Sequence, residues 1–67
     1  MKKHKVRSGN LKAKLKAKNH RLAVINAIQY SEIELDLGQL IEVVEVGKSK
    51  EEAIYVPSEM ILKVMGL

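Results

Sequence analysis

The chain has 67 residues and a formal net charge of +4, and it contains no Cys, Phe or Trp. This length predicts one small domain near the lower limit for a self-supporting core. Without cysteine, disulfide scaffolds and thiolate metal sites are excluded. No apolar run approaches the roughly 20 residues of a membrane span. The basic start MKKHKVRSGN is not followed by an apolar stretch, so we expect a cytoplasmic protein without a secretory signal.

Charge is divided unevenly along the chain. Residues 1–21 contain nine Lys or Arg and no acid, whereas residues 32–67 contain three Lys and all eight acids, a net of −5. A basic N-terminal part and an acidic C-terminal part predict that the N-terminal part binds a polyanion. The alternative is that the two parts neutralise each other within the fold or across a dimer.

Residues 1–9 are basic and contain few side chains that could pack in a core. We therefore expect a flexible basic tail over residues 1–9 and a single small β-rich domain over residues 10–67.

The stretch LKAKLKAKNHRLAVINAIQY, residues 11–30, allows two interpretations. Its Lys, Ala and Leu favour a helix by propensity, but over 11–18 apolar residues and lysines alternate with the period of a strand. A turn at Asn19–His20 would then lead into a second strand and align the apolar sides of both. This alignment favours the strand interpretation, with a third strand after a turn at Tyr30–Ser31, running to Leu37.

Two further strands and one helix complete the predicted fold. LIEVVEV, residues 40–46, is rich in β-branched residues and predicts a fourth strand after a turn at Gly38–Gln39. Residues 47–52 predict a polar loop, and AIYV, residues 53–56, a fifth strand that ends at Pro57. Ser58 is the expected N-cap of a C-terminal helix. The expected fold is mainly β (α+β), with a five-stranded antiparallel meander or barrel-like sheet followed by that helix.

The C-terminal helix is apolar nearly all round, whereas a surface helix shows one apolar stripe. A domain this small can cover one side of a short helix but hardly both, so we expect a homo-oligomer, most simply a dimer. The expected interface residues are Met60, Ile61, Leu62, Val64, Met65 and Leu67.

The basic residues of the first third are the candidates for contact with nucleic-acid phosphates. Tail and lysine row together give a predicted nucleic-acid-binding set of Lys2, Lys3, Lys5, Arg7, Lys12, Lys14, Lys16, Lys18 and Arg21. The competing interpretation is a solvated outer face whose lysines pair with Glu34 and Asp36, which is worth only about 0–1 kcal/mol per exposed pair.

No pattern in the sequence indicates catalysis. His4 and His20 are the only imidazoles, and neither has further ligands at a metal-binding spacing nor partners for a triad. The glycines follow no phosphate-loop pattern, so we expect no enzyme activity and no cofactor. Two isolated tyrosines, Tyr30 and Tyr55, are more often packing or turn residues than base-stacking platforms. Asn26 is out of place on the predicted apolar face.

These features predict a small nucleic-acid-binding protein, such as a transcriptional regulator or architectural factor. DNA is favoured over RNA because few rings are available to stack unpaired bases. The alternative is a protein-interaction module, a subunit or inhibitor, that docks through its acidic half and its apolar C-terminal helix.

Overall fold

A computed structural model describes residues 1–31 and 34–66. They form a small α+β fold with a four-stranded antiparallel open sheet and two helices. In chain order the elements are β1 (Lys2–Ser8), β2 (Leu11–Ala17), α1 (His20–Gln29), β3 (Leu40–Glu45), the 3-10 turn η1 (Lys50–Glu52), β4 (Ile54–Pro57) and α2 (Ser58–Val64).

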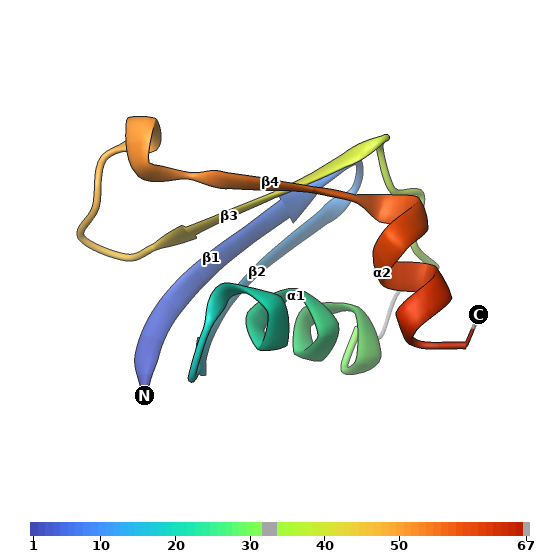
Figure 1. The fold of residues 1–67 in the computed structure, drawn as a ribbon, viewed down its shortest axis with the longest axis horizontal. Coiled ribbons are helices and arrows are strands. Elements are labelled where there is room, and N and C mark those ends of the chain that lie inside the picture. The colour runs from blue at the N-terminus through green and yellow to red at the C-terminus, as the bar shows by residue number, and fades with distance from the viewer. Residues whose placement is uncertain (32–33, 67) are drawn as a thin grey trace.

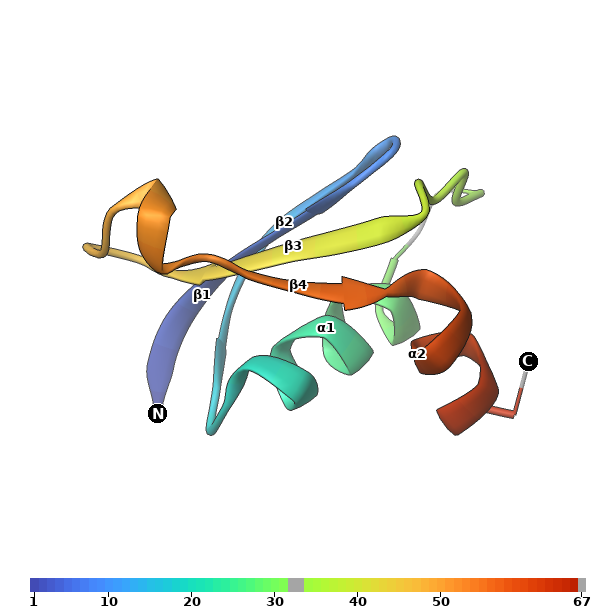
Figure 2. The ribbon, with the colours of Figure 1, turned by 45° about the horizontal axis from the view of Figure 1, so that its top comes forward.

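The strand order across the sheet is β2-β1-β3-β4, so the first strands of the two hairpins lie side by side in the middle. Both helices lie on the same side of the sheet, as two views of the ribbon show (Figures 1 and 2). Helix α1 packs on β2, β1 and β3, and α2 packs on β4. One broad face of the sheet, here called the outer face, is therefore left without a helix over it.

The expectation of a flexible tail over residues 1–9 is wrong for residues 2–8, which form the central strand β1. From His4 onward every second residue of this strand is buried, namely His4, Val6 and Ser8. Two of these three are polar, and each has a hydrogen-bond partner. His4 Nδ1 lies 2.9 Å from the Lys2 carbonyl oxygen, and Ser8 Oγ donates to the Leu40 carbonyl oxygen at 2.8 Å. These bonds allow a polar sequence to fill an interior strand position.

The first predicted strand, over residues 11–18, is confirmed as β2, but the second is wrong, because residues 20–29 form the helix α1. The expected turn residue Asn19 is instead the N-cap, and its side chain accepts a hydrogen bond from the Leu22 N–H at 2.9 Å. Asparagine favours both turns and N-caps, so it does not distinguish them. The register proposed between residues 11–18 and 21–29 therefore does not exist, and β2 pairs with β1 instead.

The sheet has four strands rather than five and is open rather than barrel-like. The expected third strand falls on residues 32–37; Glu32 and Ile33 lie outside the described residues, and 34–37 are not in a strand. This segment is nevertheless held against the β1–β2 turn. Asn10 Nδ2 donates to the Glu34 carbonyl oxygen at 2.9 Å, and the Asp36 N–H donates to Asn10 Oδ1 at 2.8 Å.

The predicted strands over 40–46 and 53–56 and the C-terminal helix are confirmed as β3, β4 and α2, with boundaries shifted by a residue or so. Ser58, however, is the first helical residue rather than the N-cap. Pro57 takes the N-cap position and has no side-chain capping bond, while the Ser58 hydroxyl donates to the Gly38 carbonyl oxygen. This bond ties the start of α2 to the segment before β3.

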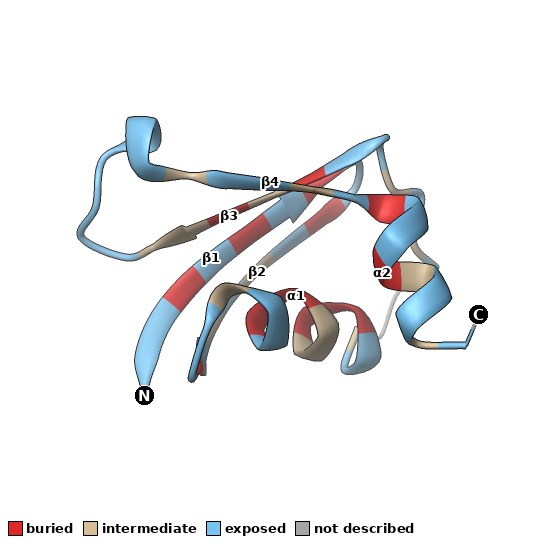
Figure 3. Cartoon of the chain, in the orientation of Figure 1, coloured by how far each residue is buried: buried red, intermediate tan, exposed pale blue. Residues whose placement is uncertain are grey.

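The core lies between the sheet and α1. Buried bands alternate with exposed ones along β1, and one side of α1 is buried (Figure 3). Val6, Ile41 and Val43 of the central strands are fully buried, as are Ala23 and Val24 of the helix. The opposite strand positions therefore face away from the core, on the outer face.

Candidate nucleic-acid interface

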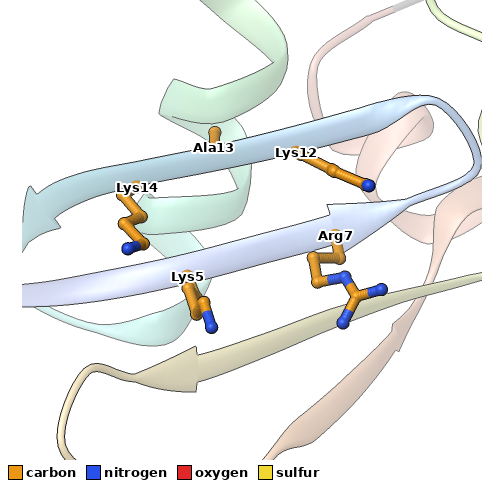
Figure 4. Close-up of a pocket in the computed structure, with 5 residues that line it drawn as sticks. All are labelled: Lys5, Arg7, Lys12, Ala13 and Lys14. Atoms are coloured by element: carbon orange, nitrogen blue, oxygen red, sulfur yellow. The ribbon is translucent and has the colours of Figure 1, made fainter.

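The outer face of β1 and β2 carries six cations in three cross-strand pairs. Strand register places Lys3 opposite Lys16, Lys5 opposite Lys14, and Arg7 opposite Lys12. Figure 4 shows the Lys5, Arg7, Lys12 and Lys14 side chains on this face, with Ala13 turned toward α1. We call this set the cationic ladder, and its members are Lys3, Lys5, Arg7, Lys12, Lys14 and Lys16.

The ladder follows directly from two alternating strands joined by a tight turn. In both strands the residues between the cations face the core, so each strand presents a cation at every second position. These positions repeat at about 6.6–6.8 Å along each strand. The antiparallel register then brings the two rows of charge into line, one on each strand.

Gly9 and Asn10 fix that register from the turn. Gly9 has a φ of +53°, and a Cβ built there would lie 1.8 Å from the Asp36 carbonyl oxygen. A side chain is therefore excluded at Gly9 by the chain that passes over the turn. The Asn10 N–H also donates to that same carbonyl oxygen, at 3.2 Å.

Among the described residues no member of the ladder forms an ion pair, although Glu42 of β3 lies opposite Arg7 in the strand register. The only ion pair there joins Lys2 Nζ and Glu45 Oε1 at 3.4 Å, and neither residue belongs to the ladder. The alternative, in which the lysines pair with Glu34 and Asp36, is not seen; the backbone of these two acids is bonded to Asn10 at the turn. Like charges directly opposite one another on neighbouring strands destabilise a sheet, so the ladder is unfavourable for the free protein.

Two further lysines, from the β3–β4 loop, lie beside the ladder. A hollow of about 220 Å³ is lined by Lys5, Arg7 and Lys14 of the ladder, by Lys48 and Lys50 of the loop, and by the acids Glu42 and Glu45 of β3. Residues 47–52 were predicted only as a polar loop, so Lys48 and Lys50 are not among the predicted binding residues. Their position depends on where the β3–β4 hairpin turns back, so no local sequence signal identifies them.

Three residues of the predicted binding set lie outside the ladder. Lys2 is at the start of β1 in the core-facing alternation and pairs with Glu45. Lys18 follows the end of β2, and Arg21 lies in the first turn of α1, on an element that packs against the other face of the sheet. The structure thus brings six of the nine predicted residues together on one face.

The outer face of β3 and β4 is different in character. Its outward residues include Leu40 and Tyr55, which are 52% and 51% exposed, and the half-buried Val44 and Glu42. The Tyr55 hydroxyl donates to Glu42 Oε2 at 3.1 Å across the two strands. This hydrogen bond is the main reason that the pKa of Tyr55 is raised above its ordinary value of 10.0, with smaller effects from desolvation and from the charge of Glu42.

Only some of the residues predicted to form an oligomer interface are exposed on the surface. Met60 and Val64 are 55% and 49% exposed on α2, whereas Ile61 is buried in the core. Leu62 and Met65 are half-buried, and Leu67 lies outside the described residues. Helix α2 therefore uses one side for the protein's own core and exposes the Met60 and Val64 side.

The two histidines lie together on the core side of the sheet. The ring centroids of His4 and His20 are 5.0 Å apart in an edge-to-face arrangement. Among residues 1–31 and 34–66, no three His, Cys, Asp or Glu side chains form a group that could hold a metal ion. The same part of the chain contains no helix long and apolar enough to cross a lipid bilayer.

Comparisons with protein-family models, with curated protein sequences and with solved structures find no match for this chain.

Proposed function

We propose that this protein binds nucleic acid through the cationic ladder, with the phosphate backbone as the group that it contacts. The observation that carries the proposal is the register itself: three like-charged pairs, Lys3–Lys16, Lys5–Lys14 and Arg7–Lys12, meet on one helix-free face. Residues 2–8, which the sequence predicted as a flexible tail along the phosphates, are part of the sheet, so the contact surface is a rigid strand pair.

A polyanion offsets the repulsion within the ladder. Each phosphate that a Lys or Arg neutralises releases condensed counterions, which favours binding at low salt. A small single anion has no need of six aligned cations, whereas a polymer with regularly spaced charges can contact both rows. Phosphate contacts position the ligand and carry no sequence information. A regulatory or architectural role in the cytoplasm, without enzyme activity, accordingly stays a prediction.

The test is a salt series with two charge-matched double variants. Binding of labelled nucleic acid is measured by fluorescence anisotropy for the unchanged chain, for Lys5→Glu/Lys14→Glu, and for Arg21→Glu/Lys63→Glu. Both double variants change the net charge equally, but only the first alters the ladder. If all six ladder residues contact phosphates, the slope of log affinity against log salt is about −4 to −5 in the unchanged chain.

We expect the ladder variant to lose at least 100-fold in affinity and to flatten the slope by about 1.5–2. The helix variant should stay within about threefold, because its two residues lie on α1 and α2. Equal losses from both variants would show that net charge alone attracts the ligand, and would contradict the ladder as the binding surface.

A second candidate function, docking on another protein or on a second copy of the chain, is favoured by one observation. Met60 and Val64 are four residues apart, so they lie on one side of α2, and both are about half exposed. We propose that this side supports the expected homodimer. Sedimentation of the unchanged chain should show a dimer that Met60→Glu converts to a folded monomer. A monomer at high micromolar concentration without the substitution would contradict it.

A further inference from the structure

The outer face has two halves of different chemistry, and they lie side by side. The ladder on β1 and β2 borders a surface on β3 and β4 where Leu40 and Tyr55 are about half exposed. Neither of the two helices covers either half (Figures 1 and 2). A ligand that carries only charges would contact the ladder and leave the tyrosine ring and the leucine without a contact. A ligand with both charged and flat apolar groups can contact both halves of the face.

One row of residues crosses all four strands and joins the two halves. Lys12 lies opposite Arg7, Arg7 opposite Glu42, and Glu42 opposite Tyr55. Since neighbouring strands are about 4.8 Å apart, the backbone positions of Arg7 and Tyr55 are about 10 Å apart. The bond from the Tyr55 hydroxyl to Glu42 directs the ring across the sheet toward β3. A nucleotide with its phosphate on Arg7 can therefore place its base near this ring.

The width of the face disfavours a duplex as the ligand. Four strands span about 14 Å between the outermost backbones, whereas the major groove of B-DNA is about 12 Å wide and admits a helix or a two-stranded ribbon. A duplex resting on the face would offer phosphates to the ladder but keep its bases stacked inside. Leu40 and Tyr55 would then have no base to contact.

We propose that the ligand of this face is a single-stranded nucleic acid, with its phosphates on the cationic ladder and its bases over Tyr55 and Leu40. This inference rests on the proposed function and adds the strandedness of the ligand and the residues that contact unpaired bases. Stacking on an aromatic ring is tolerant of sequence, because every base has a flat face. Single-stranded DNA and RNA share this chemistry.

The first experiment compares ligands and ring variants by fluorescence anisotropy. The ligands are single-stranded DNA, single-stranded RNA and duplex DNA of one mixed sequence, about 12 nucleotides long. We expect at least one single strand to bind tenfold or more tightly than the duplex. Tyr55→Ala should lower single-strand affinity at least fivefold with an unchanged salt slope, while Tyr55→Phe keeps the ring and stays within twofold. Tyr30→Ala is the matched control, because Tyr30 follows α1 and is 75% exposed.

The second experiment detects the ring contact directly and does not depend on affinity. In a Tyr30→Phe variant, Tyr55 is the only tyrosine, and stacking on a base should quench its fluorescence when a single strand saturates the protein. Preference for the DNA or the RNA strand identifies the sugar, and either preference supports the inference.

The outcomes separate the two proposals. If the duplex binds as tightly as the single strands, Tyr55→Ala is silent and no quenching occurs, the single-strand inference is overturned while the ladder remains the binding surface. If none of the three nucleic acids binds in a salt-dependent way, the proposed function fails, and the single-strand inference fails with it.

Discussion

The two halves of the chain have the same order of elements but are built differently. β1, β2 and α1 form one ββα unit, and β3, β4 and α2 form another; their first strands, β1 and β3, are neighbours at the centre of the sheet. The first unit has a two-residue turn and a ten-residue helix that packs on three strands. The second has a long loop containing η1 and a seven-residue helix.

The two units make different contributions to the protein. The first unit supplies most of the helix packing and all six members of the ladder. The second unit completes the core through Ile41, Val43 and Ile61 and leaves Tyr55, Met60 and Val64 exposed. We infer that the first unit provides affinity, whereas the second provides the contacts that distinguish ligands and partners.

The largest expected difference is in the free energy of unfolding when glycine is replaced by alanine in the turn of each hairpin. In Gly9→Ala the new Cβ meets the Asp36 carbonyl oxygen at 1.8 Å, whereas in Gly47→Ala nothing lies within 4 Å. Both glycines have positive φ, +53° and +97°, so both variants bear a backbone cost of about 1–3 kcal/mol. We expect Gly9→Ala to lower the free energy of unfolding by clearly more than about 3 kcal/mol, measured by urea unfolding. Equal losses in the two variants would contradict the close approach at Gly9.

The second largest expected difference is between the N-termini of the two helices, in how much stability the N-cap residue contributes. Asn19→Ala deletes the bond from the Leu22 N–H and should lower the free energy of unfolding by about 1 kcal/mol. Asn19→Asp keeps an acceptor and should lose little. Helix α2 has no side-chain cap to delete, since Pro57 is at that position. Thermal unfolding followed by circular dichroism should therefore show a lower midpoint for the alanine variant alone; a silent Asn19→Ala would mean that α1 is held by packing without its cap.

The ladder, which we propose binds phosphates, should lower the stability of the free protein. Lys14→Thr removes one member of the Lys5–Lys14 pair and introduces a β-branched residue, so we expect the free energy of unfolding to rise by up to about 1 kcal/mol at low salt. The gain from reduced repulsion should shrink as salt screens it. Lys48→Thr in the β3–β4 loop is the control and should be nearly neutral. A loss of stability in Lys14→Thr at low salt would argue against strain in the ladder.

The smallest expected effect is a pH dependence at Tyr55. Because the hydroxyl donates to Glu42, the neutral phenol is favoured and its pKa lies above 10.0. The associated stability is fully present below the ordinary tyrosine pKa and is lost as the pH rises through the raised value. Ultraviolet titration of the Tyr30→Phe variant should show this raised pKa, and adding Glu42→Gln should lower it. An unchanged titration after Glu42→Gln would remove Glu42 as the cause.

The amino-acid sequence alone determined the elements that have a regular apolar pattern or a clear bias in composition. The alternation of Leu and Ala with Lys identified β2, the β-branched run identified β3, and the apolar stretch after Pro57 identified α2. In each case the local period or composition agrees with the element that forms, although the strands still depend on partner strands for their backbone hydrogen bonds. The concentration of positive charge up to Arg21 likewise predicted the proposed binding region.

Tertiary structure decided the remaining elements. Residues 2–8 alternate as a strand, but His4 and Ser8 suit a buried face only once they bond to the Lys2 and Leu40 carbonyls. In α1, the buried residues Ala23, Val24, Ala27 and Ile28 follow a helical spacing, yet Val24 and Ile28 also fitted the predicted strand pairing with residues 11–18. β2 instead pairs with β1 and forms one edge of the sheet, so the cationic ladder exists only through a partner strand that the sequence presented as a tail.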